Sequence, residues 1–93
     1  MALAAEQVEV IAELLRTAPT LPEAAAGWRR CYPDVRAVRI SAVDMRDETP
    51  ALEVGARRAY FARSGGMCVS VTAHASEADI VIFTEDGAAH GDR

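Results

Sequence analysis

Three carboxylates stand close together in the densest cluster of charged groups in the chain. Asp44, Asp47 and Glu48 fall within five positions, and Arg46 lies between them. Carboxylate oxygens are the ligands that a hard cation such as Ca²⁺ or Mg²⁺ takes. The spacing differs from that of an EF-hand loop and no glycine supplies its sharp turn, so we favour a charged structural turn that Asp44 caps.

Two cysteines and two histidines allow other chemistry. Cys31, Cys68, His74 and His90 make up four zinc ligands, but their spacing is not that of a structural zinc site. Cys68 could instead be a nucleophile, with His74 as its base and Asp79 as the orienting acid. No nucleophile elbow accompanies it, so we favour cysteines that stay free thiols and pack as small hydrophobes.

Arginines surround an aromatic pair in the second half of the chain. Arg57, Arg58 and Arg63 bracket Tyr60 and Phe61. Arg and Tyr are common anchors of protein interfaces, so this group could receive an anionic ligand or an acidic partner surface. Charges at strand ends also discourage edge pairing, and a solvated strand edge is the alternative interpretation.

Two helices are expected before these groups. Apolar residues recur every three or four positions and predict a helix over residues 4–17: Ala4, Val8, Ile11, Leu15 and Ala18. Thr20 and Glu23 have the spacing of a capping box and predict the start of a second helix. Tyr32 precedes Pro33 and should close that helix.

Strands are expected in the rest of the chain. Alternating or continuous apolar residues predict strands at 35–43, 58–63, 67–72 and 80–83. A weaker segment covers 52–55. The uninterrupted run at 80–83 should lie centrally in a sheet or pair across a dimer. We therefore predict an α+β fold in which two N-terminal helices pack on a mainly antiparallel sheet of about four strands.

Size and composition limit the classes of function. The chain has 93 residues, which suits one domain over 1–84 with a flexible tail at 85–93. Its formal charge is -4 and all its basic residues are Arg, so nucleic acid is a disfavoured partner. Acidic residues interrupt the N-terminal apolar segment, so we expect a cytoplasmic protein without a membrane span. No glycine-rich phosphate loop or other cofactor signature occurs, and we expect no cofactor.

Three short segments resemble a known family. They are Leu21–Ala25, Tyr32–Arg36 and Asp44–Pro50. Together they are similar to short uncharacterised proteobacterial proteins found beside nitrogen-fixation genes, and the resemblance covers about residues 20–84. It implies an accessory role in making or protecting nitrogenase or its cofactor machinery, and it assigns no catalytic residue. Met67 stands where the family pattern has His, which argues against a metal role beside Cys68.

These observations together favour a non-enzymatic accessory protein. We expect it to dock on a larger protein partner through an exposed sheet edge and the loop at 44–50, with a homodimer as a further possibility. The candidate partner-binding residues are Asp44, Arg46, Asp47, Glu48, Arg58 and Tyr60. The alternatives are a small metal or cofactor carrier that uses the carboxylates, Cys68 or His74, and a thiol-dependent enzyme.

Overall fold

The computed structural model describes residues 3–65 and 68–86 of the chain. It has two helices followed by five strands: α1 (Ala5–Thr17), α2 (Leu21–Cys31), β1 (Arg36–Arg39), β2 (Leu52–Val54), β3 (Arg57–Gly65), β4 (Cys68–Thr72) and β5 (Ile80–Glu85). A single 3₁₀ turn, η1 (Ala75–Glu77), precedes β5. The predicted α+β class is confirmed. Neither α1 nor α2, the two α-helices of the described residues, has the length and hydrophobicity of a membrane-spanning helix.

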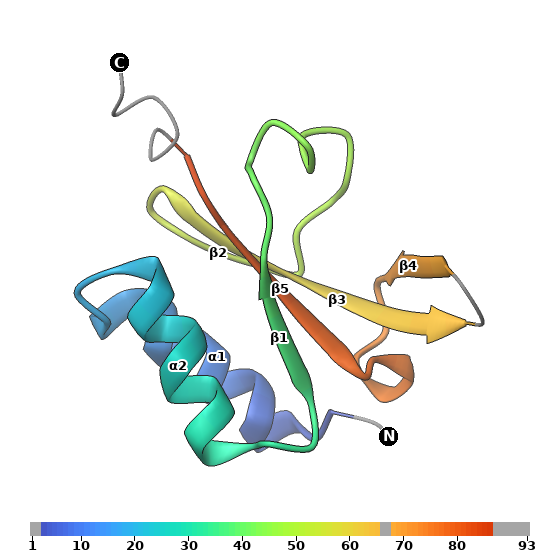
Figure 1. Ribbon diagram of the computed structural model, residues 1–93, viewed down its shortest axis with the longest axis horizontal. Helices are drawn as coiled ribbons and strands as arrows, with labels where there is room; N and C mark the ends of the chain where they lie inside the picture. Colours follow the sequence, from blue (N-terminus) through green and yellow to red (C-terminus); the bar gives the residue numbers. More distant parts are fainter. Residues whose placement is uncertain (1–2, 66–67, 87–93) are drawn as a thin grey trace.

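The strands form one mixed sheet in the order β1-β5-β3-β2 (Figure 1). β5 lies between β1, to which it is parallel, and β3, to which it is antiparallel. β2 and β4 both pair with the other edge of β3, one after the other. The apolar run at 80–83 is therefore central, as predicted, and is not free to pair across a dimer. The weak segment at 52–55 forms the fifth strand.

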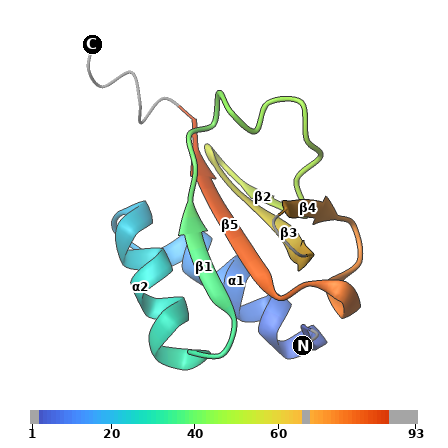
Figure 2. The ribbon, with the colours of Figure 1, turned by 45° about the vertical axis from the view of Figure 1, so that its right-hand side comes forward.

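Both helices pack on one face of the sheet, as two views of the ribbon show (Figures 1 and 2). Ile11 and Leu15 of α1 and Trp28 of α2 are buried there with Val81 and Phe83 of β5. The helical periodicity of the sequence brings these side chains to one side of each helix. Every second residue of β5 faces this helical layer.

The helix ends follow the predicted signals closely. Thr20 is the N-cap of α2, and its Oγ1 accepts a hydrogen bond from the N–H of Glu23 at 3.3 Å. Tyr32 ends the same helix. Cys31 is a free thiol, but its side chain is exposed. The expectation that it packs as a small hydrophobe is therefore wrong, because the inward stripe of α2 ends at Trp28.

The loop after β1 covers the second face of the sheet. Met45 from this loop is buried with four strand residues, Tyr60, Ala62, Ile80 and Ile82. The predicted strand at 35–43 ends at Arg39, because the chain then leaves the sheet to supply this cover. The loop bridges from β1 to β2 (Figure 2). Both faces of β5 are thus covered, which explains its continuous apolar sequence.

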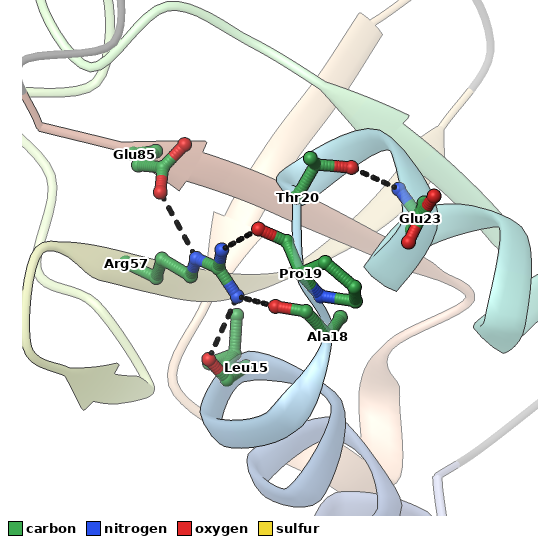
Figure 3. Close-up of polar contacts among 7 residues, drawn as sticks. All are labelled: Leu15, Ala18, Pro19, Thr20, Glu23, Arg57 and Glu85. Carbon is green, nitrogen blue, oxygen red and sulfur yellow. Dashed lines mark hydrogen bonds and ion pairs between the residues drawn. The ribbon is translucent and has the colours of Figure 1, made fainter.

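Arg57 joins the end of α1 to the sheet (Figure 3). Its Nη1 donates to the carbonyl oxygens of Leu15 and Ala18 at 3.1 and 2.6 Å, and its Nη2 donates to that of Pro19 at 3.1 Å. Its Nε donates to Glu85 Oε2 at 2.9 Å. Arg57 is therefore a structural residue that satisfies carbonyl groups left open at the helix end.

Candidate functional site

The loop at residues 41–50, which we call the charged loop, is built from consecutive tight turns. The N–H groups of Asp44, Met45 and Glu48 donate to carbonyl oxygens three positions earlier, at 3.0, 3.1 and 3.0 Å. Ser41 Oγ accepts from the N–H of Val43 at 3.3 Å. The side chain that caps the turn is therefore Ser41, and the interpretation of Asp44 as the cap is wrong. The aspartate side chain stays exposed instead.

A hollow of about 360 Å³ lies between this loop, β2, β3 and the end of β5. We call it the loop hollow. Its lining residues are Ala42, Arg46, Glu48, Pro50, Glu53, Arg58, Tyr60 and Asp86. Four of the six residues predicted for partner binding line it together: Arg46, Glu48, Arg58 and Tyr60. The fold thus brings the charged loop and the strand arginine into one place, although they are far apart in the sequence.

Arg58 is the electrostatic centre of the loop hollow. Its Nη1 donates to Asp86 Oδ1 at 2.6 Å and its Nε donates to Glu53 Oε2 at 3.0 Å. The hydrogen bond with Asp86 raises the pKa of Arg58 well above its ordinary value, and the bond with Glu53 adds to the effect. In return, the guanidinium of Arg58 lowers the pKa of Asp86. Arg58 and Asp86 therefore form a charged pair at neutral pH, which suits neither group to proton transfer.

Tyr60 lines the loop hollow from the sheet, where it belongs to β3. The residue is only 2% exposed. Its hydroxyl donates to the carbonyl oxygen of Met45 at 3.3 Å, which ties β3 to the loop above it. The ring therefore supports the loop from within, and little of it is available to a partner.

The two remaining predicted residues lie elsewhere on the loop. Asp47 lines a second hollow of about 390 Å³ between the loop and β4, together with Glu48, Pro50 and Val71 among others. Asp44 lines neither hollow and is exposed. Within the described part of the chain, no group of three His, Cys, Asp or Glu side chains is placed to hold one metal ion. The three carboxylates of the loop are thus spread over its surface.

Asp79 and His74, the acid and base of the thiol-enzyme alternative, do not contact each other through a hydrogen bond. Asp79 accepts from the N–H and the Oγ of Ser64, at 3.0 and 2.8 Å. These two bonds lower the pKa of Asp79. The side chain of His74 is exposed, and its N–H donates to Thr72 Oγ1 at 3.2 Å. No hydrogen bond joins Asp79 to His74 within residues 3–65 and 68–86, so the acid is engaged in holding β3. His90 and Met67 lie outside the described residues.

Two acidic residues of the loop hollow were missed in the sequence. Glu53 lies directly opposite Arg58 in the β2–β3 hairpin, which turns at Gly55 with a φ of 59°. This pair follows from the hairpin register, so a firmer assignment of the weak strand at 52–55 would have found it. Asp86 lies in the segment predicted to be a flexible tail, but its N–H donates to the carbonyl oxygen of Ala56 at 2.7 Å. Glu85, in β5, and Asp86 are thus part of the folded domain.

Comparisons with known proteins found no match for this chain. No family model, no curated protein and no solved structure matches this chain. The resemblance to the family found beside nitrogen-fixation genes stays a prediction. The function has to be inferred from the geometry of this chain alone.

Proposed function

We propose that this protein is a non-enzymatic interaction module that docks on a larger protein partner through the loop at residues 41–50 and the adjoining loop hollow. One observation carries the proposal. Met45 is 6% exposed and fixes the middle of the loop on the sheet, while its neighbours Arg46, Asp47 and Glu48 stay exposed. Charged side chains on an anchored backbone form a surface whose shape is set before binding.

The charges of the loop are available to a partner. The side chains of Arg46, Asp47 and Glu48 make no hydrogen bond or ion pair with any residue that the structure describes. Val43, on the same loop, is 52% exposed and adds an apolar contact. A surface with both signs of charge and an apolar side chain can recognise a partner by electrostatic complementarity.

The chemistry of the loop hollow supports recognition over catalysis. Arg58 is already paired with Glu53 and Asp86, so its charge is neutralised locally. Catalytic sites instead keep a nucleophile, base or acid with a pKa tuned toward neutral pH. The pKa of Arg58 is raised and the pKa of Asp86 is lowered, so both pKa values move further from neutral pH. Following the family resemblance, we propose an accessory role beside nitrogen fixation as the cellular setting.

The experiment is a pull-down with the full chain as bait from source cells grown under nitrogen-fixing conditions. One variant replaces Arg46, Asp47 and Glu48 with Ala. The matched control replaces Glu9, Glu13 and Arg16 with Ala, which removes the same charges from the exposed face of α1. We expect a stoichiometric partner that the wild type and the control retain and the loop variant loses, and that binds the purified protein directly. Equal recovery with all three baits would refute the proposal.

A further inference from the structure

The arginines differ in whether a carboxylate neutralises them. Arg16, Arg57, Arg58 and Arg63 each form an ion pair with Glu or Asp. Within the described part of the chain, no such pair forms at four exposed arginines of one short segment, which are Arg29, Arg30, Arg36 and Arg39. Asp34 is the only acidic residue between positions 29 and 39. A local positive surface therefore exists on a chain whose net charge is -4.

Three of these arginines lie along the outer edge of β1. The N–H groups of Arg36 and Ile40 donate to the carbonyl oxygens of Asp79 and Phe83, at 3.3 and 3.1 Å. The N–H and C=O groups of the alternate residues, Ala37 and Arg39, therefore point away from β5 toward the open edge. Arg29 reaches this edge from α2, where its Nη2 donates to the carbonyl oxygen of Ala37 at 2.9 Å. β1 is thus an edge strand with cations on and beside it.

Part of this edge is open to pairing. Beyond the β1–β5 ladder, no residue in the described ranges bonds to the N–H of Ala37 or to the N–H and C=O of Arg39. These groups match the donor and acceptor pattern that an antiparallel strand would complete. The alignment with β5 puts Arg36 on the face of Ile80 and Arg39 on the face of Phe83. Positive charge therefore flanks the open edge on both faces.

The positive charge of this edge determines which kind of strand can bind there. A second copy of β1 would bring its own arginines against these, and like charges across a strand pair are destabilising. A segment rich in Glu or Asp would instead form ion pairs with Arg29, Arg36 and Arg39 while its backbone joins the sheet. The opposite edge of the sheet is formed by β2 and β4, and it offers no equivalent because neither strand contains an arginine.

We propose that the outer edge of β1 binds an extended acidic segment of a partner protein as an added antiparallel strand. This surface is separate from the loop hollow, and it does not depend on the function proposed for that hollow. Main-chain hydrogen bonds to the N–H of Ala37 and to the N–H and C=O of Arg39 set the register. The arginines supply selectivity for negative charge.

The test measures fluorescence anisotropy of a labelled, capped octapeptide, Glu-Glu-Val-Val repeated twice, titrated with the full chain at low salt. This probe places carboxylates on both faces of an added strand. We expect the Arg36→Glu, Arg39→Glu double variant to weaken binding about tenfold. The matched control is the Arg16→Glu, Arg30→Glu double variant, which makes the same change of net charge outside β1. Arg16 is exposed in the last turn of α1, and Arg30 Nη2 lies 3.8 Å from the Cβ position at Gly27, on the side of α2 that faces Leu14. We expect it to weaken binding less than about twofold.

Two further probes separate strand pairing from simple charge attraction. The same peptide with every backbone nitrogen methylated should bind at least about fivefold more weakly, because neither of its edges can then donate hydrogen bonds to the ladder. Amide exchange of Ala37 and Arg39 should slow when the unmodified peptide binds. Equal binding of the methylated peptide, equal binding by the double variant, or tighter binding of an oligouridylate than of the peptide would each overturn the proposal. Far-UV circular dichroism checks that each variant is folded.

Discussion

Arg57 and Glu85 face each other across β3 and β5, and their ion pair holds the end of α1 against the sheet. The Nε–Oε2 distance is 2.9 Å, and the arginine side chain is only 15% exposed. The remaining guanidinium nitrogens donate to three carbonyl groups at the end of α1 (Figure 3). One side chain therefore links the helical layer to two strands.

Replacing Arg57 with Ala should lower the free energy of unfolding by about 2–4 kcal/mol, because it leaves Glu85 and the helix-end carbonyls without their donor. Arg57→Lys should lose less, since an ammonium keeps the charge but not the fork of donors. Urea denaturation measures both. The control is Arg63→Ala. Arg63 Nη1 lies 3.9 Å from Glu77 Oε1, and the arginine side chain is 58% exposed. It should change stability by less than about 0.5 kcal/mol, and an equal effect at both arginines would contradict the structural role.

Met45 should hold the charged loop in place. Met45→Ala removes a side chain that packs with Tyr60, Ile80 and Ile82, and it should cost about 2–3 kcal/mol in the free energy of unfolding. Met45→Leu keeps the volume and should cost less than about 1.5 kcal/mol. Hydrogen exchange at the amides of residues 44–48 should also become faster in the Ala variant. A variant with unchanged stability and exchange would show that the loop is held by something else.

Thr84 should be a stabilising position for substitution. It is fully buried in β5, and its Oγ1 has no hydrogen-bond partner among the described residues. Thr84→Val keeps the shape and removes the unpaired hydroxyl, so it should raise the free energy of unfolding by about 1–2 kcal/mol. Thr72→Val is the comparison, because Thr72 Oγ1 bonds Glu77 Oε1 at 2.9 Å and accepts from the N–H of His74 at 3.2 Å. That variant should be destabilised; a loss of stability in Thr84→Val would contradict the assignment.

Asp79 should contribute to the loss of stability in acid. Its hydrogen bonds from Ser64 lower the folded-state pKa below the ordinary value of 3.8. The unfolded state therefore binds more protons in this range, so the contribution is complete above the ordinary pKa and disappears as the pH falls through the folded pKa. Asp79→Asn should make the acid limb of the stability curve shallower below about pH 4. NMR titration of the Asp79 carboxyl carbon gives the shift directly, and a midpoint at or above 3.8 would refute it.

The helices and the central strand could be predicted from the sequence because their signals are local. The periodic stripe around Ile11 and Leu15, the Thr20 cap and the Tyr32–Pro33 stop depend on neighbours within a few positions. The apolar run at 80–83 indicated a strand covered on both faces. The candidate site was predicted in part, since Arg46, Glu48, Arg58 and Tyr60 do meet in the structure.

Apart from the Glu53–Arg58 pair of the β2–β3 hairpin, the contacts of those residues were decided by tertiary structure. The sequence marked Arg57 and Arg58 as equivalent neighbours, but strand alternation sends one to the end of α1 and the other to Glu53 and Asp86. Met45 became a core residue only because the sheet left one face open for its loop. The edge position of β1 likewise depends on strand order, which pairs residues 44 positions apart, such as Arg36 and Ile80. Local sequence fixes which segments are helix or strand, whereas pairing between distant segments fixes which charges are neutralised and which are exposed.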